Sequence, residues 1–365
     1  MGSSKLISTR ELFYIVLLLH QGGVFWVLPY LLVKENGTAS LVSLLSGLLL
    51  GAVIIAVCAF WGSRCREITF IPSLTQLLGK PLGKIVGLLF VLFYAAFAVI
   101  SLYTCIEVIG GQLLLETPRT LLICTVFLLV GWLSWNGLED MARLTVLCVV
   151  LVAAILLLAL AGSVELFSVE NLLPLELRSV KDIRPALLHS VFAYSGLMIL
   201  FMIYPALNQT RRAASGMLLA MVVSTGIFVV WVLLALGVFG QFSTGSMIWL
   251  PLELARMIRI SSFLERTEAL FAVLWLAIVF VNSSLLLWSV SESLHQLLER
   301  QKSRWLHWGL VTLLALICMQ IKDILRMFAL EWHLARGSVV LLPLLLVLVL
   351  AGSWLYGRRK GGAPQ

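Results

Sequence analysis

Long apolar blocks constrain this chain more than any other feature of its sequence. Leu147 to Leu160 and Val339 to Leu350 consist almost entirely of Leu, Val, Ile and Ala. Blocks of this kind, extended to about 20 residues, have the length that an α-helix needs to cross a bilayer. Their apolar residues are consecutive rather than alternating, which argues against a β-barrel. The sequence therefore predicts an all-α polytopic membrane protein.

The composition favours the same class. Hydrophobic residues make up 61% of the chain and charged residues 12%, whereas soluble domains are near half apolar and a quarter charged. The net charge of +8 comes from short basic clusters between apolar runs, a pattern typical of membrane topology, so we expect no nucleic-acid partner. The six cysteines form no CxxC pair and are expected to pack as small side chains.

Ten apolar runs are candidate transmembrane spans. They cover approximately residues 11–33, 40–61, 84–106, 119–136, 143–163, 186–206, 216–240, 267–291, 305–321 and 338–356. We interpret residues 1–365 as a single transmembrane domain, with repeats at about 11–163 and 186–356 and a short basic tail at 357–365. The first run leads straight into further spans, so we expect no cleavable signal peptide.

The distribution of basic residues predicts the orientation. With the N-terminus inside, fifteen of the 26 Lys and Arg residues lie on the inner side. The clusters Arg211-Arg212 and Arg358-Arg359-Lys360 contribute most to this bias, because basic residues in short loops stay in the cytoplasm. We therefore expect both termini in the cytoplasm.

Two spans contain helix-breaking signals at corresponding positions. The first contains Gly22-Gly23 near mid-depth and then Pro29; the sixth contains Ser195-Gly196 and then Pro205. Glycine weakens a helix and proline lacks a backbone donor. Breaks in spans 1 and 6 are what a five-plus-five inverted repeat places around a ligand site. The alternative is that the glycines allow close helix packing and the prolines are tolerated kinks.

Polar residues inside two other spans are further candidates. Tyr103 and Glu107 share one helix face, and Asn282-Ser283-Ser284 lies near the middle of the eighth span. Polar groups in hydrocarbon are costly, so these are expected to face the bundle interior. Alternatively, Glu107 lies at the outer interface and the serines bond back to their own helix. The candidate ligand-binding residues are Gln21, Gly22, Gly23, Tyr103, Ser195, Gly196, Ser283 and Ser284.

Motifs for catalysis are missing from the sequence. It contains no GxSxG, P-loop, HExxH or zinc-ligand spacing. We therefore expect no enzymatic activity, no cofactor and no metal site. Neither break has an adjacent carboxylate, and His20 is the only titratable residue close to either one.

Several short motifs resemble one known family. They are Thr117-Pro118, the segment Asn136 to Arg143 (NGLEDMAR), Asn171 to Pro174 (NLLP), Leu250 to Arg256 (LPLELAR), and Leu264 to Glu268 (LERTE) followed by Trp275. Their order and spacing, from about residue 7 to the tenth span, resemble the B subunit of bacterial spore germinant receptors.

The resemblance implies a fold and a set of partners. Members are similar to permeases of the amino acid, polyamine and organocation superfamily, and they reside in the inner membrane of the spore. They are thought to bind small germinants, often amino acids, and to work with an A-type subunit and a lipoprotein C-type subunit. Many relatives carry Gly-Glu in the sixth span, whereas here Leu197 follows Gly196. This departure leaves the ligand class open or indicates a less polar ligand.

Three functions remain open from the sequence. The first is a germinant sensor that binds a small solute between spans 1, 3, 6 and 8 and signals to partner subunits. The second is a secondary amino acid transporter, because Ser283 and Ser284 resemble the hydroxyls that hold sodium in some superfamily members. The third is a scaffold subunit with a vestigial pocket. Binding without uptake would distinguish the sensor from the transporter.

Overall fold

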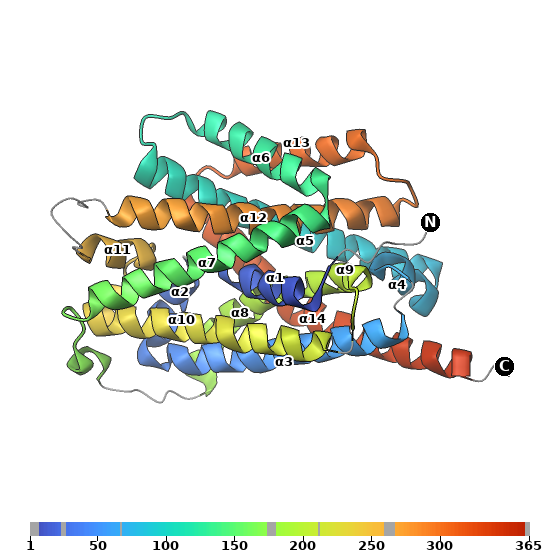
Figure 1. The fold of residues 1–365 in the computed structure, drawn as a ribbon, viewed down its shortest axis with the longest axis horizontal. Helices are drawn as coiled ribbons and strands as arrows, with labels where there is room; N and C mark the ends of the chain where they lie inside the picture. Colours follow the sequence, from blue (N-terminus) through green and yellow to red (C-terminus); the bar gives the residue numbers. More distant parts are fainter. Residues whose placement is uncertain are drawn as a thin grey trace.

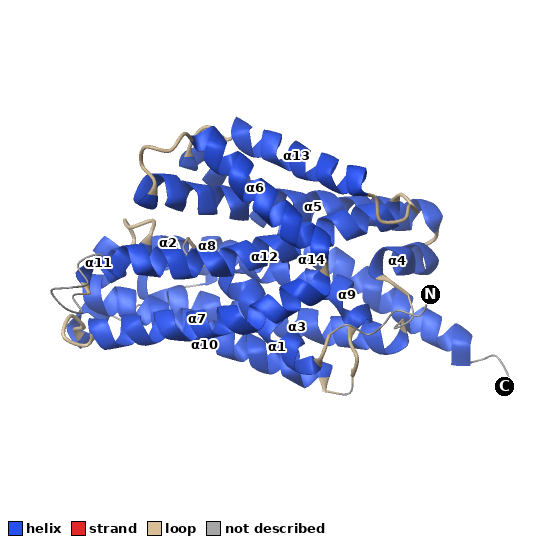
Figure 2. Ribbon diagram, turned by 45° about the horizontal axis from the view of Figure 1, so that its top comes forward, coloured by secondary structure: helices blue, strands red, loops and turns tan. Residues whose placement is uncertain are grey.

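The computed structural model describes residues 7–22, 27–65, 68–173, 180–210, 212–258 and 267–361, and the elements in these ranges are helices (Figures 1 and 2). In chain order they are α1 (Thr9–Gly22), α2 (Leu28–Asn36), η1 (Gly37–Ala39), α3 (Ser40–Arg64), α4 (Phe70–Leu78), α5 (Lys80–Val108), η2 (Ile109–Leu113), α6 (Arg119–Asn136), α7 (Leu138–Ser163), η3 (Val169–Leu172), α8 (Val180–Ser195), η4 (Gly196–Ile199), α9 (Leu200–Ile203), η5 (Tyr204–Ala206), α10 (Ala213–Thr244), α11 (Leu250–Met257), α12 (Thr267–Leu297), α13 (Arg304–Gln320) and α14 (Ile324–Gly361).

These helices follow the order of the ten predicted spans. Within the described ranges, eight helical stretches are long and apolar enough to cross a bilayer by themselves. The first span is divided between α1 and α2, and α13, the ninth, has 17 residues. The chain is thus a multi-pass membrane protein of about ten spans, with breaks in spans 1 and 6.

Helix packing repeats itself when the two halves are exchanged. Corresponding spans pack against each other: α2 on α8, α3 on α10, α5 on α12 and α6 on α13. Other contacts come in exchanged pairs as well: α1 on α10 matches α8 on α3, and α1 on α7 matches α8 on α14. In Figure 1, α3 and α10 run along one side of the bundle and α6 and α13 along the other. This is the arrangement of a five-plus-five inverted repeat.

Short elements mark the two ends of the bundle. Helix α14 ends at the right-hand end of Figure 1, on the side of α4 and α9, and α11 lies at the opposite end. The start of the first span lies beside the end of the sixth. There, the Ile7 amide donates to the Ala206 carbonyl (3.2 Å) and the Asn208 amide donates to the Ile7 carbonyl (2.9 Å). These bonds form a parallel β-bridge between Ile7 and Leu207.

The outer faces of the helices are as apolar as the interior. Phe70 and Phe201 stack inside the bundle with ring centroids 4.9 Å apart, while Leu147, Val150 and Leu157 of α7 are exposed. Exposed apolar area on this scale is an interaction surface rather than a surface for water. Lipid is the solvent that these side chains suit.

The tenth span begins earlier than the sequence predicted. It was expected at residue 338, but α14 begins at Ile324, directly after Asp323, whose Oδ1 accepts a hydrogen bond from the Arg326 amide (2.8 Å). A carboxylate in this position satisfies an amide that the first turn leaves unpaired. The residues just before position 338 include several charged ones, which is typical of a loop outside the membrane. One of these charged residues, Glu331, is nevertheless buried.

Candidate functional site

The break in span 1 is bounded by a glycine and a proline. Helix α1 ends at Gly22, and α2 begins at Leu28 with Pro29 in its first turn. Proline is tolerated there because the first amides of a helix have no intrahelical acceptor. Gly23, one of the predicted ligand-binding residues, lies outside the described residues.

Gly22 lets α1 approach α12 at the position of Asn282. A Cβ added to Gly22 would lie 2.3 Å from the Asn282 Cβ and 2.4 Å from its Cγ, so only glycine allows this contact. The sequence suggested that the glycines leave room for a solute. The structure instead fills the space at Gly22 with the Asn282 side chain.

The Asn282 side-chain amide is buried and lacks a hydrogen-bond partner within the described chain. The residue is 1% exposed, and both its side-chain nitrogen and its oxygen are unpaired. An unpaired buried polar group costs about 1–3 kcal/mol. Such a group in a native protein calls for an explanation, and a bound ligand is one.

Two more polar residues hold the end of α1 against α10. Gln21 Nε2 donates to both the carbonyl oxygen and the Oγ of Ser224, each at 2.9 Å. His20 Nδ1 lies 2.9 Å from the same hydroxyl, and its ring packs between Tyr194 and Phe228, with centroids at 4.3 and 4.8 Å. His20 Nε2 has no hydrogen-bond partner in the described ranges, so a second unpaired polar atom lies beside the break.

A small pocket opens beside Gln21. It is narrow, with a cavity volume of about 10 Å³, which is close to the space of one water molecule and far below the roughly 300–1,000 Å³ of a typical small-molecule site. Its lining comes from spans 1, 5, 7 and 8, namely Gln21, Val152, Ile155, Trp231, Trp275 and Ile278. The pocket therefore has aromatic and aliphatic walls with one amide.

The break in span 6 has its polar groups satisfied. Helix α8 ends at Ser195 and the chain tightens into the 3-10 turn η4. Ser195 Oγ donates to the Phe192 carbonyl (2.6 Å), and the Tyr94 hydroxyl donates to the Ser195 carbonyl (2.6 Å). A Cβ on Gly196 would lie 3.5 Å from the Phe97 ring, an ordinary contact.

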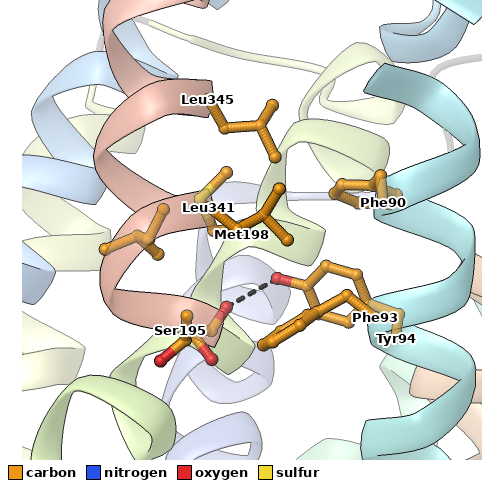
Figure 3. Close-up of a pocket in the computed structure, with 9 residues that line it drawn as sticks. Phe90, Phe93, Tyr94, Ser195, Met198, Leu341 and Leu345 are labelled. Carbon is orange, nitrogen blue, oxygen red and sulfur yellow. Dashed lines mark hydrogen bonds between the residues drawn. The ribbon is translucent and has the colours of Figure 1, made fainter. Parts of the chain in front are cut away.

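A second pocket lies at this break. Figure 3 shows Phe90, Phe93 and Tyr94 facing Leu341 and Leu345 across it. The pocket has a cavity volume of about 10 Å³ and extends between α5, α8, η4 and α14. Apart from the Ser195 and Ser338 side chains and the Tyr94 hydroxyl, its lining is apolar.

The two predicted serines of α12 behave differently. Ser283 Oγ lies 3.1 Å from Ser101 Oγ on α5, so it connects spans 3 and 8. Ser284 Oγ donates to the Phe280 carbonyl (2.7 Å), which is the back-bonding alternative. Together with Asn282, α12 presents polar groups toward both α1 and α5.

Tyr103 lies in a different group from the breaks. The Arg119 guanidinium stacks over its ring at 4.7 Å, and Arg119 pairs with Glu107 at 3.1 Å. This group joins α5 to α6. The Tyr103 hydroxyl itself is buried and has no hydrogen-bond partner in the described chain. Because Glu107 has Arg119 as its charged partner, its place in the bundle requires no bound ligand.

The sequence missed several residues that surround the predicted ones. Tyr94, Ser224 and Trp231 contact or neighbour the breaks, but single residues of these types in an apolar run give no signal. Asn282 was noted as an amide in mid-span but was left out of the candidate set. Within the described ranges, no three His, Cys, Asp or Glu side chains gather as metal ligands.

Comparison with protein families and curated proteins agrees with the motif resemblance. The family described as "Spore germination protein" matches residues 6–326, which confirms that resemblance. The spore germination protein YndE of Bacillus subtilis is 19% identical over 350 residues, covering 95% of this chain and 96% of the relative. The spore germination protein GerQB of Bacillus cereus is 22% identical over 223 residues, 61% of each chain.

Solved structures share the fold at low sequence identity. A manganese transporter of Eremococcus coleocola superposes with a TM-score of 0.70 at 15% identity, over 93% of this chain and 78% of that one. MhsT in complex with L-phenylalanine gives 0.65 at 16% identity, over 95% and 91%. The nucleobase-cation-symport-1 family transporter MHP1 gives 0.63 at 14%. These neighbours are transporters rather than enzymes.

Proposed function

This chain belongs to the family of spore germination proteins, and from that premise we propose that it is the germinant-sensing subunit of a spore germination receptor. It binds a small nutrient such as an amino acid and passes a conformational change to A-type and C-type partner subunits. It resides in the inner membrane of the bacterial cell or spore, with both termini in the cytoplasm. The curated relatives, which are spore germination proteins, support this role.

The observation that carries the proposal is the unpaired Asn282 amide at the Gly22 break. Its nitrogen is a donor and its oxygen an acceptor, and neither is used within the described chain. A ligand with a carboxylate and an ammonium group supplies one partner for each. The backbone groups freed where α1 ends offer further partners. The site thus suits a zwitterion better than an ion of one sign.

The proposed ligand has little net charge and an apolar body. The four residues between the described ends of the break, Gly23-Val24-Phe25-Trp26, include no charged residue. Trp231 and Trp275 line the neighbouring pocket. A buried ionised ligand without a countercharge would be strongly disfavoured. An amino acid with a neutral, apolar side chain meets both conditions.

The proposed binding residues surround the two breaks. Asn282 joins the set predicted from the sequence, and Tyr103 stays in it because its buried hydroxyl has no hydrogen-bond partner in the described chain. The proposed ligand-binding residues are Gln21, Gly22, Gly23, Tyr103, Ser195, Gly196, Asn282, Ser283 and Ser284.

A secondary amino acid transporter is the alternative. It is favoured by the shared fold with MhsT, which was solved with L-phenylalanine. Against it, neither break has a carboxylate adjacent in sequence that could carry a coupling proton. A sensor needs only that the ligand favours one of two arrangements, and a coupling of about 1–3 kcal/mol suffices for that.

Binding and uptake measured in one preparation separate these functions. The full chain is reconstituted in liposomes and offered each common amino acid in radiolabelled form. We expect saturable binding of at least one amino acid with a neutral side chain and no gradient-driven accumulation. Accumulation would establish the transporter instead, and no binding of any of them would reject the ligand class.

Two variants locate the site. Asn282→Leu keeps the approximate volume but removes both polar atoms, so binding should fall at least about tenfold, the equivalent of one lost hydrogen-bonded group. Ser289→Ala, two turns along α12, also alters a buried polar side chain and should leave binding unchanged. Equal binding by the two variants would place the site elsewhere.

A further inference from the structure

The loop between α12 and α13, residues 298–303, is held in place by a buried histidine. His295 is 3% exposed, and its Nε2 accepts the Ser303 amide (2.9 Å). Its Nδ1 lies 2.6 Å from the Ser291 carbonyl oxygen, and its own carbonyl accepts the Arg300 amide (3.0 Å). The backbone of this loop is thus fixed to the end of α12, which gives its charged side chains defined starting points.

Positive charge is concentrated where this loop meets the start of α5, at the right-hand end of the bundle in Figure 1. Lys84 Nζ lies 2.8 Å from Glu299 Oε1, which places the two segments side by side. Residues 80–84 and 298–305 contain one acidic residue, Glu299, and five exposed basic residues, so the excess is four positive charges. The five, which we call the basic corner, are Lys80, Lys84, Arg300, Lys302 and Arg304.

Two guanidinium groups of the basic corner have no carboxylate partner. Lys302 Nζ donates to the Trp135 carbonyl (2.6 Å) and lies 4.4 Å from the Trp135 ring centroid. The Arg304 guanidinium lies 5.8 Å from the same centroid. Within the described ranges, neither Arg300 nor Arg304 forms an ion pair. Both are available to an anion, and a guanidinium binds phosphate through two parallel hydrogen bonds.

An exposed apolar stripe of α13 begins at the basic corner. Trp305, which follows Arg304 in sequence, is 91% exposed. Gly309, Leu313 and Leu316 follow at helical spacing and are exposed as well, so they share one face of the helix with Trp305. A Cβ added to Gly309 would meet no atom within 4 Å. The helix surface is therefore bare one turn beyond the tryptophan.

The length of α13 brings the basic corner to the level of the lipid headgroups. The helix has 17 residues, about 26 Å at 1.5 Å per residue, whereas the hydrocarbon core of a bilayer is about 30 Å thick. A span that is too short thins the bilayer around it, and its flanking residues reach the headgroups. Tryptophan is enriched at this level of membrane proteins, as Trp305 is here.

We propose that the basic corner and the α13 stripe bind one anionic phospholipid. Arg300 and Arg304 hold the headgroup phosphate, and an acyl chain runs along the stripe past Gly309. Charge complementarity selects an anionic lipid, because the choline of a zwitterionic headgroup carries its own cation and offsets the phosphate. The stripe selects a lipid over a soluble phosphate, which has no apolar part to cover Leu313 and Leu316.

Lipid binding by the purified full chain tests this proposal without any amino acid, so the outcome does not depend on the proposed sensor role. Native mass spectrometry from detergent micelles compares phosphatidylglycerol with phosphatidylcholine at matched concentrations. We expect one saturable phosphatidylglycerol per chain, bound at least about tenfold more tightly than phosphatidylcholine. Equal affinities overturn the proposal. Displacement of the lipid by excess glycerol 3-phosphate would assign the corner to a soluble phosphate and overturns it as well.

Matched double variants show whether the two arginines are responsible. Arg300→Gln with Arg304→Gln removes both proposed phosphate contacts from exposed positions, and phosphatidylglycerol should bind at least about tenfold more weakly. Lys322→Gln with Arg326→Gln removes two exposed basic side chains beyond the other end of α13 and should keep the original affinity. Equal affinities of the two double variants would show that total charge, and not this corner, binds the lipid.

Photocrosslinking locates the acyl chain. A phosphatidylglycerol that carries a diazirine in one acyl chain is bound to the full chain and irradiated, and the labelled peptides are identified by mass spectrometry. We expect the label on α13 between residues 305 and 316, and less of it in Arg300→Gln with Arg304→Gln. Labelling confined to other helices overturns the placement of the lipid on this stripe.

Discussion

The two helix breaks differ in how their polar groups are satisfied. At Gly22 the neighbouring Asn282 amide and the His20 Nε2 atom have no hydrogen-bond partner in the described chain. At Ser195 the freed carbonyl accepts the Tyr94 hydroxyl. The repeat is therefore symmetric in backbone and asymmetric in chemistry: the first break has free hydrogen-bonding capacity for a ligand, and the second is held by the protein itself.

The largest expected effect comes from adding one methyl group at the first break. Gly22→Ala places its Cβ 2.3 Å from the Asn282 Cβ, and relieving this overlap should cost about 3 kcal/mol of stability. Gly196→Ala meets only an ordinary contact with Phe97 and should cost much less. Thermal unfolding in nanodiscs measures both. Gly226→Ala on α10, where an added Cβ would meet no atom within 4 Å, is the control. Equal losses of stability at Gly22 and Gly196 would contradict the difference between the two breaks.

The next variant should raise the stability of the protein and weaken ligand binding. Asn282→Leu removes two unpaired buried polar atoms, so the ligand-free protein should gain about 2 kcal/mol while binding is lost. The melting temperature and amino acid binding are measured on the same preparation. A destabilised Asn282→Leu protein would mean that the amide is already satisfied.

A smaller loss is expected at the second break. Tyr94→Phe removes the hydroxyl that donates to the Ser195 carbonyl and should cost about 1 kcal/mol without weakening ligand binding. Tyr14→Phe on α1 removes a hydroxyl away from both breaks and is the control. A binding loss as large as that of Asn282→Leu would assign ligand contacts to the second break as well.

The smallest effects distinguish the two serines of α12. Ser283→Ala breaks the contact with Ser101, and such interhelical bonds are worth about 0.6 kcal/mol in membranes. Ser284→Ala removes a bond within its own helix and should change stability by less than about 0.5 kcal/mol. Unfolding measurements on both variants, with the double variant for additivity, give the ranking. A larger loss for Ser284→Ala would reverse it.

Sequence reasoning reached the fold because each span is a local property. The apolar runs and the Gly22 and Ser195-Gly196 breaks are visible without any knowledge of neighbours. The predicted start of the tenth span was wrong because the stretch before residue 338 carries several charged residues; one of them, Glu331, is buried in contact with His189. Hydropathy averages over a window and cannot assign one charged residue to a distant partner.

The site was harder to predict than the fold for the same reason. Asn282 matters because it packs on Gly22, 260 positions away in the sequence, and the two residues give no joint signal. Tyr103 was predicted from its polar character inside a span and from the helix face that it shares with Glu107. Nothing in the sequence indicated that the Arg119 guanidinium stacks over the Tyr103 ring, because the two residues lie on different helices.

The β-bridge between Ile7 and Leu207 sets a free-energy difference as well as a geometry. Its two backbone hydrogen bonds contribute roughly 1 kcal/mol each, so the bridged arrangement is favoured about 30-fold over the parted one. A preference of this size holds the start of span 1 and the end of span 6 together for most of the time, with about 3% of the population parted. A ligand that bound only the parted form would therefore have to overcome about 2 kcal/mol.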